Sequence, residues 1–139
     1  MGQTTLVERL SPQVNRFVAE AIDRGVDIRA YGWAQTSQYG WPYLFLVSPQ
    51  ARGEQERAAN DTIQSILRGG GKVWLRLSET QLVEPTDRLA RELLSIAERI
   101  PDDGDPSPVV HHATDLGGVE IFGPAYIYPV PKPAPATGN

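Results

Sequence analysis

The apolar residues of this chain change their spacing at residue 25, and this change constrains the fold more than any other feature. Before Gly25, apolar residues recur at helical spacing and form one stripe of Val14, Phe17, Val18, Ala21 and Ile22. Ser11 and Pro12 precede the stripe as an N-cap and a first helical residue, and Gly25 is a typical helix stop. After Gly25, apolar and polar residues alternate with a period of two. We therefore predict a helix followed directly by a strand.

The alternating residues after Gly25 predict a β-hairpin. Its strands cover 26–33 and 41–47, joined by a short polar connection at 35–38. A turn centred on Thr36 and Ser37 gives the cross-strand pairs Val26 with Val47, Ile28 with Phe45, Ala30 with Tyr43, and Gly32 with Trp41. This register collects small and large apolar residues on one face, as a core face requires.

Two further helices and a strand are predicted in the middle of the chain. Residues 53–68 form a helix that the glycines 69–71 end, and its apolar side consists of Ala59, Ile63, Ile66 and Leu67. Residues 72–77 alternate as a short strand. A third helix begins near Thr86 and ends at Pro101, because proline cannot continue the helical hydrogen bonds. Its inward residues are Leu89, Leu93, Ile96, Ala97 and Ile100.

The last third of the chain predicts short strands and a tail. Residues 101–108 have the composition of an exposed loop, and the strands that follow cover 109–113, 119–122 and 125–130. The proline-rich residues 131–139 favour an extended tail. We therefore predict one α+β domain over residues 1–130, with about three helices on a mostly antiparallel sheet in the order α-β-β-α-β-α-β-β.

Charge is distributed unevenly along the chain. The net charge is −4, and the acids of residues 101–139 are Asp102, Asp103, Asp105, Asp115 and Glu120, against the single base Lys132. Residues 1–100 are neutral overall. Nucleic-acid-binding domains normally have a basic face, so this balance argues against a nucleic-acid partner. An arginine-mediated site would have to use Arg52, Arg57, Arg68, Lys72 and Arg76.

The cellular setting follows from what the sequence lacks. There is no cysteine, which excludes disulfides, thiol nucleophiles and thiolate metal sites. No run of about 18 apolar residues occurs, so no membrane span is predicted. The first residues have neither the basic start nor the apolar stretch of a signal peptide. These observations predict a cytoplasmic protein that does not insert into membranes.

No pattern of catalytic or metal-binding residues stands out. His111 and His112 are the only histidines, and neighbours on a strand point to opposite faces, so their rings do not converge on one metal ion. The acidic residues 102–105 lack the ligand spacing of a calcium loop. The glycines 69–71 follow a helix and precede a strand, the reverse of a phosphate-binding loop. The sequence therefore predicts no catalytic residue, no metal site and no cofactor.

The sheet face opposite the predicted core is the strongest candidate for a binding surface. It is rich in aromatic residues and arginine, the composition enriched at binding interfaces. We assign to it Tyr31, Trp33, Leu44, Leu46, Trp74, Arg76, Tyr126 and Tyr128. The competing interpretation is that a helix covers this face as a second core layer.

Two functions remain open at this point. The first is a non-catalytic interaction domain that uses this face to bind a protein partner or a second copy of itself, giving a homodimer. The second is a small-molecule-binding protein or minor enzyme, with a pocket lined by Tyr31, Trp33, Trp74 and His112. A flat face would favour the first function, and a concave, mostly apolar pocket would favour the second.

Overall fold

The computed structural model describes residues 6–36, 43–69, 80–101, 107–112 and 114–129. Within these ranges the elements are α1 (Leu6–Asp23), β1 (Ala30–Ala34), β2 (Tyr43–Val47), α2 (Gly53–Gly69), β3 (Thr80–Val83), α3 (Arg88–Glu98), β4 (Val109–His111), β5 (Asp115–Leu116), β6 (Val119–Glu120) and β7 (Ala125–Ile127). The α+β class and the order of helices and strands agree with the prediction.

The main sheet has the strand order β3-β2-β1-β7-β4, and β5 and β6 form a separate two-stranded ribbon. Three neighbouring pairs of the main sheet are antiparallel, and β2 and β3 are parallel. The sheet is therefore mostly antiparallel, as predicted. The parallel pair follows from the chain order, because α2 carries the chain from the end of β2 back to the start of β3.

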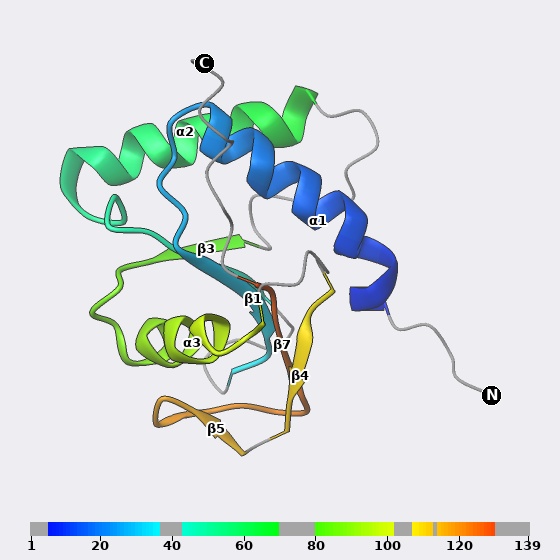
Figure 1. Ribbon diagram of the computed structural model, residues 1–139. Coiled ribbons are helices and arrows are strands. Elements are labelled where there is room, and N and C mark those ends of the chain that lie inside the picture. The colour runs from blue at the N-terminus through cyan, green and yellow to red at the C-terminus, as the bar shows by residue number, and fades with distance from the viewer. Residues whose placement is uncertain (1–5, 37–42, 70–79, 102–106, 113, 130–139) are drawn as a thin grey trace.

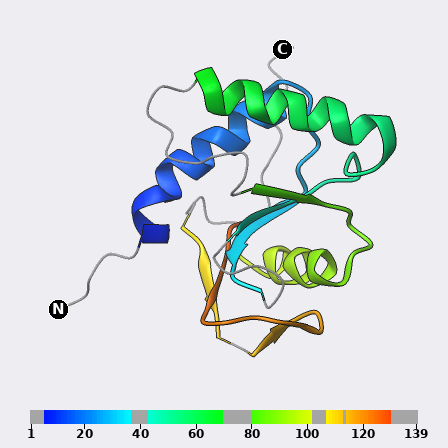
Figure 2. The same cartoon turned by 180° about the vertical axis from the view of Figure 1, so that it is seen from behind.

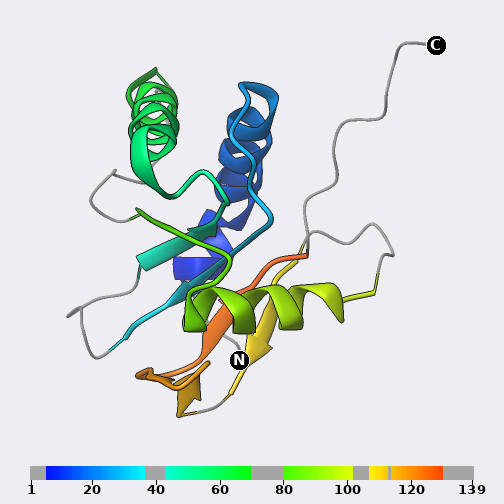
Figure 3. The ribbon, with the colours of Figure 1, turned by 90° about the vertical axis from the view of Figure 1, so that its left-hand side faces the viewer.

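The helices cover both faces of the sheet. Figure 3 shows α1 and α2 together on one face and α3 alone on the other, and Figures 1 and 2 show α1 and α2 side by side. Each face carries its own core. The core under α1 and α2 includes Phe17, Val18, Ile63, Tyr31, Trp33, Leu44, Leu46 and Tyr128. The core under α3 includes Leu89, Leu93, Ile96, Ala30, Phe45, Val47 and Ile127.

The first strand is shorter than predicted, and the hairpin register differs by four residues. Ala30 pairs with Val47 instead of Tyr43, because the strand begins at Ala30 and residues 26–29 lie outside it. Val26 and Ile28 pack in the core under α1 and α2, so their predicted place beside Ala30 on the other face is wrong. A shift by four residues, an even number, keeps the remaining residues of both strands on their predicted faces, because side chains alternate with a period of two.

The predicted apolar sides of the three helices are confirmed, but one helix end is not. Val14, Phe17, Val18 and Ala21 of α1 are buried, as are Ala59, Ile63 and Ile66 of α2 and Leu89, Leu93, Ile96 and Ala97 of α3. The predicted start of α1 at Ser11 is wrong: the helix begins at Leu6 and passes through Pro12. That proline has no N–H to donate to the preceding turn. The start of α3 is capped by Asp87, whose Oδ1 accepts from the Leu89 N–H at 3.0 Å.

The strands β3 and β5 were not predicted, and one predicted strand cannot be compared. The strand β3 at Thr80–Val83 buries only Leu82 and has no strong alternation. The strand predicted at 72–77, with Trp74 and Arg76, lies outside the described residues, as does the predicted tail at 131–139.

Two glycines are required where the layers meet. Gly117 has a φ of +63° and turns the chain between β5 and β6, and a Cβ there would collide with the backbone carbonyl of Arg88. Gly32 lies on β1, where a Cβ would stand 2.6 Å from the Tyr126 carbonyl oxygen of β7. Only glycine avoids these collisions. Gly117 therefore lets the β5–β6 ribbon pack against α3, and Gly32 lets β7 lie close to β1.

Candidate functional site

The predicted aromatic face lies inside the molecule. Tyr31 and Trp33 are 6% and 4% exposed, and Leu44, Leu46 and Tyr128 are fully buried under α1 and α2. Tyr126 is half-buried against the same core, while Trp74 and Arg76 lie outside the described residues. The prediction of an exposed surface is therefore wrong for the five buried residues. The competing interpretation, a second core layer covered by helices, is the one that the structure has.

Aromatic stacking and one hydrogen bond connect this face to α1. The rings of Tyr31 and Tyr128 are stacked, with centroids 4.7 Å apart and planes at 10°. The Tyr31 hydroxyl donates to Asn15 Oδ1 of α1 at 2.8 Å. Burial raises the pKa of Tyr31 above its usual value, because the interior disfavours the phenolate, and the neighbouring Tyr128 adds to the shift. The hydroxyl is therefore a structural donor at neutral pH.

The aromatic-lined pocket of the second predicted function does not form around these residues. Tyr31 and Trp33 present almost no surface to solvent, and His112 is exposed in the segment that follows β4. Trp33 Nε1 is buried without a hydrogen-bond partner. A ligand would have to displace α1 or α2 to reach either ring.

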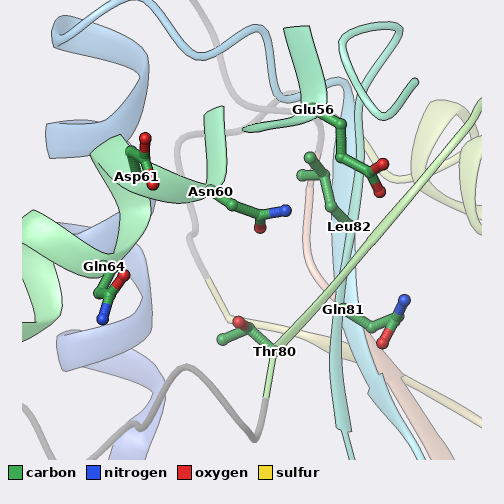
Figure 4. A pocket seen from close by; sticks show the side chains of 7 residues that line it. All are labelled: Glu56, Asn60, Asp61, Gln64, Thr80, Gln81 and Leu82. Carbon is green, nitrogen blue, oxygen red and sulfur yellow. The ribbon is translucent and has the colours of Figure 1, made fainter. Parts of the chain in front are cut away.

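A concave site is present elsewhere, between α2 and β3. It has a volume of about 370 Å³ and is lined by Glu56, Asn60, Asp61, Gln64, Thr80, Gln81 and Leu82. Figure 4 shows Asn60 extending from α2 toward β3. Leu82, the only apolar residue of this lining, is 7% exposed. Pockets for small organic ligands are mostly apolar with a few convergent polar groups, and this groove has the opposite composition.

A second hollow of about 500 Å³ continues along the outer side of α2. It shares Asp61 and Gln64 with the first and adds Ser65 and Arg68. All four residues come from successive turns of one helix, so the hollow has no opposing wall among its lining residues. Neither lining includes a histidine, a lysine or a tyrosine.

The edge of the sheet at β4 holds two of the three large apolar side chains that are exposed among the described residues. Val109 and Val110 are 40% and 42% exposed. The strand β4 stands last in the strand order, with β7 as its neighbour on one side (Figure 1). Cross-strand partners share a face, so Val109, opposite Ile127, lies on the α3 face and Val110, opposite Tyr126, lies on the α1 face. Both faces of β4 therefore present apolar area at the end of the sheet.

The hydrogen-bond pattern tells which backbone groups of β4 face outward. The Tyr128 N–H donates to the Tyr31 carbonyl of β1 at 3.1 Å, so the backbone of Tyr128 faces β1. Successive residues of a strand face alternate neighbours; Ile127 and Ala125 therefore face β4 and pair with Val109 and His111. The N–H and C=O of Val110 consequently point away from β7, toward the open side.

No charged residue lies in the described stretch of this edge. Exposed edge strands are usually blocked by lysine or other charges, by proline or by a bulge. Residues 107–112 contain no Lys, Arg, Asp or Glu, and Pro108 precedes the strand instead of interrupting it. This absence of charge in a strand near the end of the chain is the signal that sequence reasoning missed.

Among the described residues, one other large apolar side chain is exposed, and it lies away from this edge. Phe122 is 51% exposed, and its N–H donates to the Gln35 carbonyl at 2.8 Å. Its backbone is thus tied to the end of β1 and not to β4. A single exposed phenylalanine is ordinary for a protein surface, and we use it below as a control position.

Comparison of the chain with protein-family models, curated proteins and solved structures finds no match in any of the three. None of the helices in the described ranges is both long enough and apolar enough to cross a membrane. In the same part of the chain, no three His, Asp or Glu side chains come together where they would hold a metal ion.

Proposed function

We propose that this chain is a non-catalytic interaction domain that binds an extended protein segment along the open edge of β4. The observation that carries the proposal is the combination at Val110: an exposed apolar side chain together with an N–H and a C=O directed away from the sheet. This site differs from the aromatic face that the sequence suggested, while the kind of function is the same.

Strand addition is a common way for a protein to bind another chain. The added strand gains main-chain hydrogen bonds to the edge, and alternate side chains supply specificity. The edge here supports such binding because valine is β-branched and favours extended backbone. Val109 and Val110 also expose apolar area on both faces of the sheet, so an added strand would bury surface on each side.

The small-molecule alternative has weaker support. The groove between α2 and β3 is lined by amides and carboxylates, with Leu82 alone providing apolar contact. A ligand there would have to exchange hydrogen bonds to water for bonds to polar side chains that, apart from the exposed Asp61, are half-buried, and such an exchange yields little net affinity. The β4 edge offers apolar burial in addition to hydrogen bonds.

Site-specific photo-crosslinking tests the proposal. A photoactivatable amino acid is placed at position 110 of the full chain, and, as the matched control, at position 122, which is also exposed and apolar but lies off the edge. In cells that produce the protein, we expect a discrete crosslinked adduct from position 110 and a much weaker one from position 122. Absence of any adduct from position 110, or equal adducts from both positions, would contradict the proposal.

A further inference from the structure

We infer that the segment bound at the β4 edge is the β4 strand of a second copy, paired antiparallel about a two-fold axis through Val110. This inference rests on the proposed function and names the partner for the same site. In such a pair, Val110 lies directly opposite Val110 of the partner subunit. The two sheets then join into one continuous sheet across the axis.

The outward backbone groups of β4 are self-complementary in this register. In an antiparallel pair, two residues directly opposite each other exchange N–H and C=O bonds when both face the partner. Val110 faces outward, so its N–H donates to the C=O of Val110 of the partner subunit, and the reverse bond forms as well. Two residues further along, the outward His112 N–H donates to the Pro108 carbonyl of the partner subunit.

The ends of the open stretch select this register over its neighbours. At one end, Pro108 has no N–H, so a register that placed it opposite Val110 would lose a central hydrogen bond. At the other end, the Thr114 carbonyl already accepts from the Ile121 N–H at 3.0 Å, so the ladder cannot extend to it. The stretch between these limits is 108–112, and Val110 is its midpoint.

The centre of this register carries no charge that would oppose a second copy. A two-fold axis places the central residue against its own copy, so any charge there would repel itself. The central residue is Val110, and residues 107–112 contain no Asp, Glu, Lys or Arg. Val109, on the opposite face, lies against His111 of the partner subunit. Within the described residues 107–112, therefore, no pair of like charges opposes the pairing of this strand with a copy of itself.

The interface is short, and this sets the expected strength. Stable protein interfaces bury at least about 1,200 Å² in total, and a pair of strands this short buries less. We therefore expect a reversible dimer with a dissociation constant in the range of about 10 to 500 µM, and not a permanent one.

Sedimentation equilibrium of the full chain tests the inference. The monomer mass is 15.3 kDa, and between about 5 µM and 1 mM the average mass should rise toward twice that value. Val110→Lys sets two charges against each other and should weaken dimerisation at least tenfold. Val110→Thr keeps the β-branch without a charge and should change the dissociation constant by less than threefold.

Val110→Pro provides an independent test of the hydrogen-bond pattern. Proline is tolerated on an edge strand where the missing N–H faces outward, so this variant should keep the far-ultraviolet circular dichroism and melting temperature of a folded monomer but should not dimerise. Val109→Pro removes an inward N–H and should instead lower the melting temperature. A chain that stays monomeric at 1 mM, or a dimer unaffected by both Val110→Lys and Val110→Pro, overturns the inference.

The crosslinked adducts separate this inference from the proposed function. An adduct from position 110 with the mass of two copies supports both. An adduct with any other protein, without the two-copy product, supports the proposed function and overturns the second copy as partner. Absence of an adduct overturns both.

Discussion

The two central strands and the edge strand show how little the composition of a strand says about its exposure. The central strands β1 and β2 hold Tyr31, Trp33 and Tyr43, residues typical of binding surfaces, yet Tyr31 and Trp33 are almost completely buried. The edge strand β4 reads Val109, Val110, His111, which would suit a core, yet both valines are about 40% exposed. Place in the strand order decides exposure here.

Helix coverage explains the difference. The strands β1 and β2 contact α3 on one face, and their other face packs under α1 and α2. The strand β4 lies beyond β7, at the end of the strand order (Figure 1), and the main-sheet strands that chiefly contact α3 are β1, β2 and β7 instead. An aromatic residue on a central strand therefore packs in the core, while a valine on the edge strand is exposed and can contact a partner.

The largest expected effect tests the buried side of this comparison. Trp33→Ala should lower the free energy of unfolding by about 3–5 kcal/mol, because it removes a large buried side chain and leaves a cavity. Trp33→Phe should cost no more than about half of that, since it keeps a ring and removes an N–H that has no partner. Denaturant unfolding at several protein concentrations measures both losses.

The loss at Trp33 should not depend on concentration, because it arises within one chain. Phe122→Ala, at an exposed ring, is the control and should change the free energy by less than about 0.5 kcal/mol. If Trp33→Ala lowered the free energy of unfolding as little as Phe122→Ala, the aromatic face would not be a core layer, and the contrast between the central strands and the edge strand would be wrong.

The next effect tests how the β5–β6 ribbon is held against α3. Gly117 and Gly118 both have positive φ, +63° and +86°, but only Gly117 approaches the Arg88 backbone. Gly118→Ala should therefore cost about 1 kcal/mol for the backbone conformation alone. Gly117→Ala should cost about 2–3 kcal/mol, since the new methyl group also forces the ribbon away from α3. If thermal unfolding showed the same loss of stability for both variants, the close approach of Gly117 to Arg88 would contribute nothing to stability.

Local patterns predict the helices well and the strand pairing less well. The stripes on α2 and α3 come from sequence neighbours three and four residues apart, so one chain segment contains the whole signal. Pairing joins distant segments: the predicted hairpin turn at Thr36 and Ser37 was too early, and the register moved by four residues. The even shift kept the faces intact. The strand β3 escaped prediction because its pairing with β2 is parallel and only Leu82 is buried.

The candidate site could be predicted only in part, for the same physical reason. Alternation divides the residues of β1 and β2 between two faces, but it does not say which faces the helices cover. Small residues such as Ala30 and Gly32 made one face look complete, which left Tyr31 and Trp33 for the other. Both faces are cores. Exposure at Val110 depends on β4 being last in the strand order, a property of the whole fold.

A smaller effect tests the polar contact inside the buried face. Tyr31→Phe should lower the free energy of unfolding by about 1 kcal/mol at pH 7, because it removes the hydrogen bond to Asn15. The raised pKa of Tyr31 adds a pH dependence. The folded chain holds the phenolic proton more tightly than the unfolded chain, so this contribution is complete below about pH 10 and is lost as the pH rises further.

Unfolding experiments from pH 8 upward test that sign. The wild-type chain should lose stability above about pH 10, and the Tyr31→Phe variant should lose less over the same interval. Parallel curves for the two proteins would show that Tyr31 titrates normally, and the buried face would then be more open to water than its 6% exposure implies.

The smallest expected effect lies at the edge and completes the comparison. Val110→Lys should change the free energy of unfolding of the monomer by less than about 0.5 kcal/mol, because the side chain is already 42% exposed and a lysine stem can lie along the sheet with its charge in water. The measurement is made at a few micromolar, where the proposed dimer would be dissociated. A substitution that scarcely alters the monomer but abolishes self-association locates the effect in the interface, since a damaged fold would lower both quantities together. A loss comparable to that of Trp33→Ala would instead mean that Val110 is part of the core, and β4 would then be no more available to a partner than the aromatic strands beside it.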